Sequence, residues 1–172
     1  MNSDVLKKLF SFRTAFIVLL SWLLIRHAQT TLENLKKEGT YFPSSKLMNA
    51  ENSSVTVPTG ENGAWAALFW SIHCGPCRVE MELIQKSINS GLLPAERIYA
   101  IHIGGEVDSV QAHMTKNGFT FPFLVDTRGE LATRLDVALT PSLFLVDADR
   151  NIRLATSGLG VTHVFRMASH LK

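Results

Sequence analysis

The sequence contains few cysteines, and their arrangement limits the chemistry that it can carry. Only two are present in 172 residues, Cys74 and Cys77, with two residues between them. A structural zinc site needs four ligands, usually including a second Cys or His pair. No two of the six histidines are separated by three to five residues, so zinc is not expected. A permanent structural disulfide is a further alternative, but so short a loop restrains the unfolded chain little.

The sequence also lacks a basic stripe of the kind that neutralises phosphates. The formal charge is +2, and the positive excess lies near the N-terminus. Residues 1–26 contain four Lys and Arg against Asp4, a net charge of +3, whereas residues 27–172 contain 13 Lys and Arg and 14 Asp and Glu, a net charge of −1. Nucleic acid is therefore not an expected partner. Internal repeats and low-complexity tracts are absent as well.

Residues 1–28 have the features of a membrane-directing segment. An apolar run extends from Thr14 to Ile25, and the membrane contact is assigned to residues 9–25. This span of 17 residues is short for a bilayer core, which needs about 20. Three basic residues precede or interrupt it: Lys7, Lys8 and Arg13. The positive flank should stay inside, and the remainder of the chain should be exported.

Two fates of this segment compete. A cut after Ala28 would place Arg26 at the −3 position, and a cut after Thr30 would leave Thr at −1, so neither site suits a signal peptidase. An uncleaved anchor, with Arg13 extended to the interface, is therefore favoured over a cleaved signal peptide. A buried helix of a cytosolic domain is disfavoured, because the run is apolar on all sides.

Residues 29–63 are interpreted as a stalk and linker. His27 to Glu38 could continue as a short helix, and Gly39 to Gly63 is rich in Ser, Asn, Gly and Pro. Within it, Ser54 to Val57 could add an edge strand before Pro58.

From residue 64 to 172 the chain alternates strands and helices. Strands are expected at Ala64–Trp70, Arg97–Ile103, Ser142–Val146 and Ile152–Thr156, with an extended segment at Phe121–Val125. Helices are expected at Cys77–Ser90, Asp108–Asn117, Gly129–Leu135 and Thr162–Leu171. The turn at 147–151 should join the last two strands in a hairpin. This order predicts an α/β domain with a mixed sheet covered on both faces.

The cysteine pair has the spacing of a redox-active site. Cys74 should lie at a helix N-terminus, where backbone N–H groups and the helix dipole favour the thiolate. Cys77, one turn further on, would be shielded and act as the resolving thiol. Pro76 is tolerated in the first turn of a helix, and Gly75 keeps the approach to Cys74 open.

The motifs resemble those of the thioredoxin superfamily. Phe69-Trp70 and Cys74-Gly75-Pro76-Cys77 lie at a strand-to-helix turn, and Thr140-Pro141-Ser142 follows some 64 residues later. The segments at 77–81, 100–106 and 121–126 are similar to those of membrane-anchored TlpA/ResA-like thioredoxins. The resemblance covers residues 64–171. It implies a thioredoxin-like three-layer sandwich in which residues 107–126 form an inserted helix-plus-extended segment.

The resemblance assigns substrate binding to the residues around the cysteines. Pro141 would be a cis-proline that faces the pair, and Thr140 would offer backbone groups to an extended substrate, beside Gly75 and Pro76. From the sequence alone, Pro141 could equally be a trans-proline that starts a strand.

Glu80 is the first candidate for proton transfer. It follows Cys77 by three residues and shares its side of the helix. In TlpA/ResA-like proteins a Glu at this position is linked to thiol proton transfer, whereas in isolation Glu80 could be a solvated carboxylate. Many thioredoxins carry a buried Asp where this chain has Leu68, which strengthens the case for Glu80. Glu106 is a second candidate, with a helix N-cap as the alternative.

His73 departs from the superfamily pattern, which usually has Trp before the first Cys. A protonated imidazole would stabilise the Cys74 thiolate and make the disulfide more oxidising. An exposed, tolerated substitution is the alternative. The other histidines are interpreted as surface or core residues.

The resemblance implies a protein-disulfide reductase that acts on disulfide-containing exported client proteins and receives electrons from a membrane thiol donor. It would be a single-pass protein of the bacterial cytoplasmic membrane, with the catalytic domain facing the periplasm or cell exterior. No cofactor or metal is expected. The alternatives are a disulfide oxidase or isomerase, motivated by His73, and a Cu(I)-binding chaperone that uses His73, Cys74 and Cys77.

Overall fold

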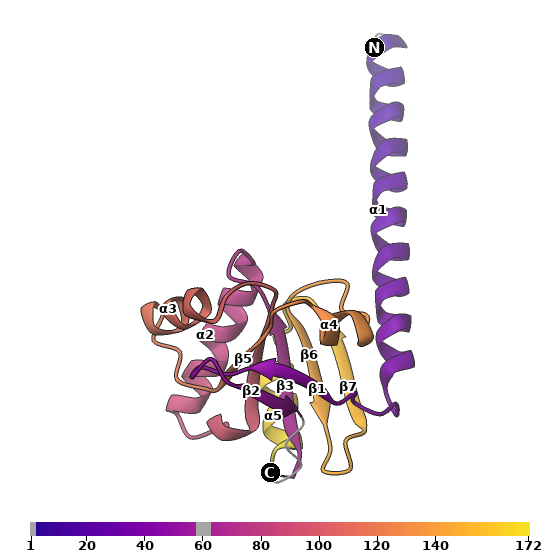
Figure 1. Ribbon diagram of the computed structural model, residues 1–172. Helices are drawn as coiled ribbons and strands as arrows, with labels where there is room; N and C mark the ends of the chain where they lie inside the picture. Colours follow the sequence, from indigo (N-terminus) through magenta and orange to yellow (C-terminus); the bar gives the residue numbers. More distant parts are fainter. Residues whose placement is uncertain (1–2, 58–62) are drawn as a thin grey trace. The chain divides into compact units, whose positions relative to one another are not determined.

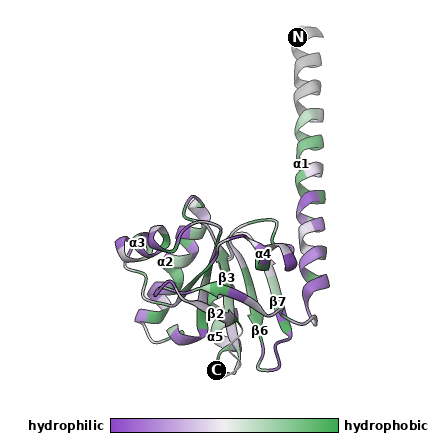
Figure 2. Cartoon of the chain, viewed as in Figure 1, coloured by the Kyte–Doolittle hydropathy of each residue, from purple (hydrophilic) through white to green (hydrophobic). Residues whose placement is uncertain are grey.

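The computed structural model describes residues 3–57 and 63–172 of the chain, which divides into two compact units between Glu33 and Asn34. Helix α1, Ser3–Lys37, makes up the described part of the first unit and ends in the second. Its side chains from Phe16 to Ile25 include many large exposed hydrophobics. Residues 14–37 are long and apolar enough to cross a membrane, and no other described helix passes that test. Figure 2 shows hydrophobic residues in this part of α1, with hydrophilic ones toward its C-terminal end.

The second unit is built on a seven-stranded mixed sheet with the order β2-β1-β5-β4-β3-β6-β7 (Figure 1). The three inner strands β3, β4 and β5 are parallel, and β6, β7, β1 and β2 are added antiparallel at the two sides. The strands are β1 Ser45–Met48, β2 Ser54–Val57, β3 Trp65–Trp70, β4 Ile98–Ile103, β5 Phe123–Asp126, β6 Ser142–Val146 and β7 Ile152–Ser157.

Helices cover both faces of the sheet. Side chains of a strand alternate between the two faces, so a central strand such as β3 contributes to both cores. All six side chains of β3 are buried. Ala66, Leu68 and Trp70 pack in one core with residues of α2, α3 and α5, whereas Trp65, Ala67 and Phe69 pack in a second core with α4. The helices are α2 Gly75–Asn89, α3 Val107–Lys116, α4 Glu130–Arg134 and α5 His163–His170, and a short 3-10 helix spans Ala95–Arg97. The predicted mixed sheet covered on both faces is confirmed.

Most predicted elements from residue 64 on agree with the structure within two or three residues. Strand β6 has the predicted bounds, and β6 and β7 pair as the predicted hairpin. Helix α2 begins at Gly75, two residues before the predicted start, because Cys74 is its N-cap and Pro76 occupies its first turn. Gly91, with a φ of 74°, follows its C-cap.

The segment predicted as a linker is part of the sheet, and the edge strand considered at Ser54 to Val57 is present as β2. Strands β1 and β2 form an antiparallel hairpin, and β1 also pairs with β5 through Met48 and Val125. Phe42, Leu47 and Val57 are at most 2% exposed and belong to the second core. These few apolar residues are scattered among Ser, Asn and Lys, so the composition concealed their burial. The remaining linker positions 58–62 lie outside the described residues.

The stalk prediction is also corrected at its C-terminal end. Asn34 is 8% exposed, and its side chain hydrogen-bonds Ser157 Oγ on β7, at 3.3 Å. Ser157 Oγ in turn lies 2.8 Å from Ser142 Oγ on β6. Residues 34–37 are therefore the helical entry into the folded unit.

A substitution tests the place of β1 in the core. Leu47→Ala should lower the free energy of unfolding by about 2–5 kcal/mol, because it leaves a cavity at a fully buried site. The matched control Lys46→Ala, at an exposed position of the same strand, should change it by no more than about 0.5 kcal/mol. Urea unfolding of both variants measures the difference, and equal stabilities would contradict the structure.

Candidate active site

Cys74 and Cys77 form a disulfide at the junction of β3 and α2, with their Cα atoms 5.2 Å apart. Cys77 is fully buried, whereas Cys74 is partly exposed at the N-cap of α2. The Cys77 backbone N–H donates to Cys74 Sγ at 3.2 Å. After reduction, this donor and the helix N-terminus would stabilise a thiolate at Cys74 more than at Cys77. Gly75 and Pro76 are exposed between the two, and a Cβ at Gly75 would meet no atom within 4 Å.

The Thr140-Pro141 segment faces the disulfide. The peptide bond between them is cis, as the resemblance implies, and the trans alternative is wrong. Thr140 O lies 3.4 Å from Cys74 Sγ. The oxidised sulfur has no proton, so this is a packing contact here, but a Cys74 thiol could donate to the same oxygen. Pro141 is buried, and its carbonyl accepts a hydrogen bond from Gly158 N–H at 2.7 Å.

Glu80 lies on the buried face of α2, one turn after Cys77, and is 0% exposed. The alternative of a solvated carboxylate is wrong. Its Oε1 accepts a hydrogen bond from His163 Nδ1 at 3.0 Å, and its Oε2 accepts one from Gly160 N–H at 3.2 Å. His163 is 3% exposed at the start of α5. The sequence predicted Glu80 but not its partner, although a carboxylate at a core position of an amphipathic helix demands a buried donor.

His102 is a second buried histidine that the sequence did not single out. Its Nε2 accepts a hydrogen bond from the backbone N–H of Ile72 at 3.0 Å, so the ring proton lies on Nδ1, which donates to Gly104 O at 2.7 Å. The ring also packs edge-on against Trp70, with centroids 4.9 Å apart. The neutral imidazole of His102 thereby holds the loop that precedes Cys74 in place.

The surroundings of His102 disfavour a second proton. Burial lowers the pKa of His102 below 6.5, and the positive charges of protonated His113 and His73 lower it further, against the Gly104 carbonyl, which raises it. The pKa of His113 is lowered in the same way, by burial and then by Arg78 and Lys116. His73 itself is exposed, and its imidazole makes no hydrogen bond within the described chain. Its redox role stays a prediction.

Glu106 is exposed at the N-cap of α3, where its side chain makes no capping hydrogen bond. No three His, Cys, Asp or Glu side chains in residues 3–57 and 63–172 are grouped so that they could hold a metal ion. Both ring nitrogens of His102 are already hydrogen-bonded, so this histidine cannot add a ligand to the cysteines without breaking one of those bonds.

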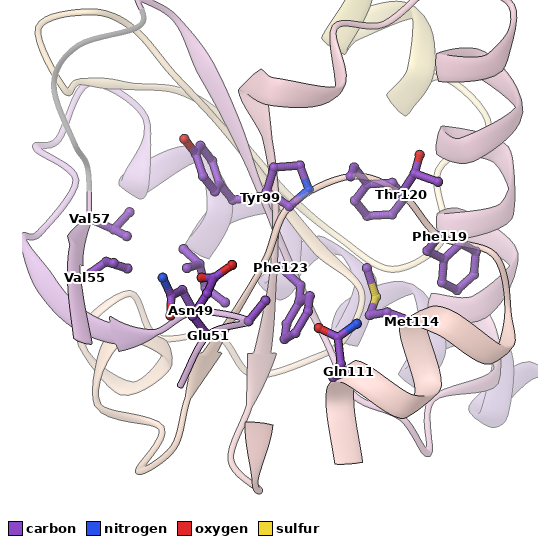
Figure 3. Close-up of a pocket in the computed structure, with 14 residues that line it drawn as sticks. Asn49, Glu51, Val55, Val57, Tyr99, Gln111, Met114, Phe119, Thr120 and Phe123 are labelled. Carbon is purple, nitrogen blue, oxygen red and sulfur yellow. The ribbon is translucent and has the colours of Figure 1, made fainter. Parts of the chain in front are cut away.

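A groove with a volume of about 450 Å³ lies away from the cysteines, between the β1–β2 hairpin, α3 and the segment before β5 (Figure 3). Its walls are largely apolar and include Val55, Tyr99 and Phe123. Glu51 is the one carboxylate among the lining residues, so the groove has no set of converging groups for catalysis.

The disulfide at a strand-to-helix turn, opposite a cis-proline, defines a thioredoxin-like site on a thioredoxin-like fold. The sequence matches the model of the AhpC/TSA family over residues 39–155, and the chain belongs to this family. The predicted membership of the thioredoxin superfamily, of the TlpA/ResA-like kind, is confirmed.

Two curated proteins illustrate the similarity. The chain is 26% identical to the thiol-disulfide oxidoreductase ResA of Geobacillus kaustophilus over 90 residues, 52% of each chain. It is 22% identical to ResA of Bacillus subtilis over 121 residues, 70% of this chain and 68% of that one. The chain thus spans about half the length of the first of these relatives. The crystal structure of StoA from Bacillus subtilis superposes with a TM-score of 0.60 and 17% identity, over 76% of this chain and 98% of that chain.

The pKa of His102 predicts an acid-sensitive fold. Between its depressed pKa and about 6.5, the folded protein binds fewer protons than the unfolded chain, so stability is complete above this range and falls as pH falls through it. His102→Gln keeps an amide that can accept from Ile72 but does not titrate. Unfolding free energy measured from pH 7.5 to 5 should therefore fall less steeply in this variant than in the parent or in His27→Gln, whose histidine lies in the first unit. Parallel pH profiles would contradict this role of His102.

Proposed function

We propose that the chain is a thiol–disulfide oxidoreductase that reduces disulfides in other exported proteins. The observation that carries this proposal is the disulfide between a partly exposed Cys74 and a buried Cys77, opposite the cis peptide of Thr140-Pro141. Cys74 Sγ can react with a sulfur of another molecule, whereas Cys77 Sγ is buried and can react only with Cys74. The names of the ResA relatives support the same reaction class.

The reaction begins from the dithiol form. The Cys74 thiolate attacks one sulfur of a client disulfide, which forms a Cys74–client disulfide and releases a client thiolate. The Cys77 thiol then loses its proton, and its thiolate attacks Cys74 Sγ. This forms the Cys74–Cys77 disulfide, releases the second client thiolate, and completes the transfer of two electrons to the client. A thiol donor must return the two electrons, and we assign that role to a membrane dithiol protein.

Exposed apolar side chains beside the site suit a protein client. Leu139, which precedes Thr140, is 54% exposed, and Leu159, which follows Gly158, is 48% exposed. Val79 on α2 is 45% exposed. An extended client segment placed against Thr140 would pair with its backbone and cover these side chains, which together favour a peptide over a small polar thiol.

Trapping tests the reaction. Cys77→Ser should retain clients as mixed disulfides through Cys74, because the resolving thiol is missing, and mass spectrometry of the trapped species would identify them. Cys74→Ser should trap none and should reduce insulin no faster than the uncatalysed reaction. If Cys77→Ser forms no mixed disulfide that Cys74→Ser lacks, the proposal fails.

The Gly75-Pro76 pair favours a reducing protein, as in reducing thioredoxins. His73, which is exposed beside Cys74, favours a more oxidising disulfide. We expect a potential near that of reducing thioredoxins, about −270 mV. Equilibration with glutathione measures it. A value near −120 mV, as in strong periplasmic oxidants, would instead favour a disulfide oxidase. If His73 causes such a high potential, His73→Trp should make the potential more negative, because the substitution removes an imidazole that can carry a positive charge near Cys74.

We propose that α1 anchors the protein in a bacterial cytoplasmic membrane, with the redox domain outside the cytoplasm. The apolar run of α1 and the basic residues Lys7, Lys8 and Arg13, which lie in α1 before or at the start of that run, support this. The double substitution Leu19→Arg and Leu20→Arg should release the protein from carbonate-washed membranes, because each charge costs about 2.5–3.5 kcal/mol at the centre of a membrane span. Arg at Thr30 and Thr31, beyond the apolar run, should leave it membrane-bound, and equal extraction of both variants would argue against the anchor.

A further inference from the structure

Glu80 and His163 form an enclosed pair beside the resolving cysteine. Their side chains are 1% and 4% exposed, and they connect α2 to α5 through the 3.0 Å contact between Oε1 and Nδ1. Cys77 lies on the same buried face of α2, one turn before Glu80. Solvent therefore has little access to the Cys77 proton, and a protein group must accept it when Cys77 attacks.

Glu80 and His163 each make one further contact outside the pair. Gly160 N–H donates to Glu80 Oε2, which supports a carboxylate. His163 Nε2 lies 3.3 Å from Thr156 Oγ1. A hydroxyl can donate to a neutral imidazole nitrogen or accept from a protonated one, so Thr156 can keep its hydrogen bond in both states of His163.

Gly160 is required for this packing. A Cβ at Gly160 would overlap the His163 ring, including Nε2 and Cε1. The His163 ring thus packs directly against Gly160, whose backbone N–H donates to Glu80. Cys77 is the thiol that shares the buried face of α2 with Glu80.

We propose that His163 is a positioning residue that keeps Glu80 ready to accept the Cys77 proton in the step that releases the client. This inference rests on the proposed function. When the pair lacks its transferable proton, it carries one negative charge, and this form accepts the proton from Cys77 Sγ. The Cys77 thiolate then displaces the client from Cys74, and the client thiolate leaves. The pair later returns its proton to Cys77, when the disulfide is reduced again.

Few other charged groups face the pair. Arg78 and Glu82 form an exposed ion pair with each other on α2. On α5, Arg166 is exposed and the His170 imidazole lies 2.9 Å from Val146 O. Strand β6 has no titratable side chain, and Arg153 of β7 pairs with Asp147. The remaining titratable groups of α2 and its N-cap are the exposed Lys86 and the two cysteines. In the same core, α3 carries Asp108, His113 and Lys116, and β4 carries Tyr99 and His102.

Ellman's reagent separates the two thiol steps in the reduced full-length protein, purified in mild detergent. Attack by Cys74 releases one coloured thionitrobenzoate anion in a phase that depends on reagent concentration. Attack by Cys77 on the resulting mixed disulfide releases a second anion in a phase that does not. Stopped-flow absorbance from pH 5 to 9 therefore gives a pH profile for each cysteine.

His163→Asn is the main variant, because its amide can donate near the position of Nδ1 but cannot gain a proton. It should slow the second phase at least about tenfold at pH 7 and move its rise to higher pH, while the first phase changes less than about twofold. Gly160→Ala should act in the same way by displacing the ring. His170→Gln, on the same helix but away from Glu80, should leave both phases unchanged.

A double-mutant cycle distinguishes a shared function from independent damage. Glu80→Gln should slow the second phase, and adding His163→Asn should slow it no further, because both act on one proton acceptor. Additive losses, or a second-phase profile of His163→Asn that overlays the parent profile, would overturn the inference. Should His163→Asn fail to fold, Thr156→Val must shift the second-phase profile, or the inference is wrong. If the parent protein itself releases no second anion, the proposed function fails as well.

Discussion

The burial of β3 on both faces governs the rest of the structure. Its six side chains all lie in the core, so the strand can only occupy the middle of the sheet, between β4 and β6. Its carboxyl end must then open directly into the Cys74 loop and α2. Strand β6 pairs antiparallel with β3, so that it starts where β3 ends and brings Pro141 to the same edge. Two segments 64 residues apart thereby meet at one disulfide.

Two buried histidines and one buried carboxylate near this edge each take part in hydrogen bonds. His102 ties the loop before Cys74 to Gly104 after β4, and Glu80 ties α2 to α5 through His163. An unpaired polar group in such places would destabilise the fold, so the pairing is as much a structural requirement as a chemical one. The same bonds hold the disulfide loop and the helix behind it in a fixed relation, on which the proposed chemistry depends.

The sequence predicted the parts of the fold that have strong periodicity. The hairpin of β6 and β7, the helix after the cysteines and the cis-proline site were found, the last only through a resemblance. It raised β2 as a possible edge strand but did not predict β1, because β1 has only four residues and few apolar ones. In such strands, pairing to β5 and contact with Phe42 decide the structure, and neither is visible locally.

The candidate site was predicted in the same uneven way. Cys74, Cys77 and Glu80 follow from spacing along one helix. His102 and His163 lie 28 and 89 residues after Cys74, on other elements, and act through contacts that form only after the sheet is assembled. A histidine has no local sequence signature that separates a buried hydrogen-bond partner from a surface residue. The sequence therefore does not distinguish His102 and His163 from the other histidines.

Trp70 gives the site an optical property of its own. Its indole is 1% exposed, its Nε1 has no hydrogen-bond partner among the described residues, and its ring contacts both His102 and His113. Protonated imidazoles and disulfides both quench indole emission, and Trp70 shares its core cluster with Cys77. The other two tryptophans, Trp22 and Trp65, lie in α1 and in the opposite core. Intrinsic fluorescence of this chain therefore contains a built-in signal from the disulfide loop, which can be followed without a label.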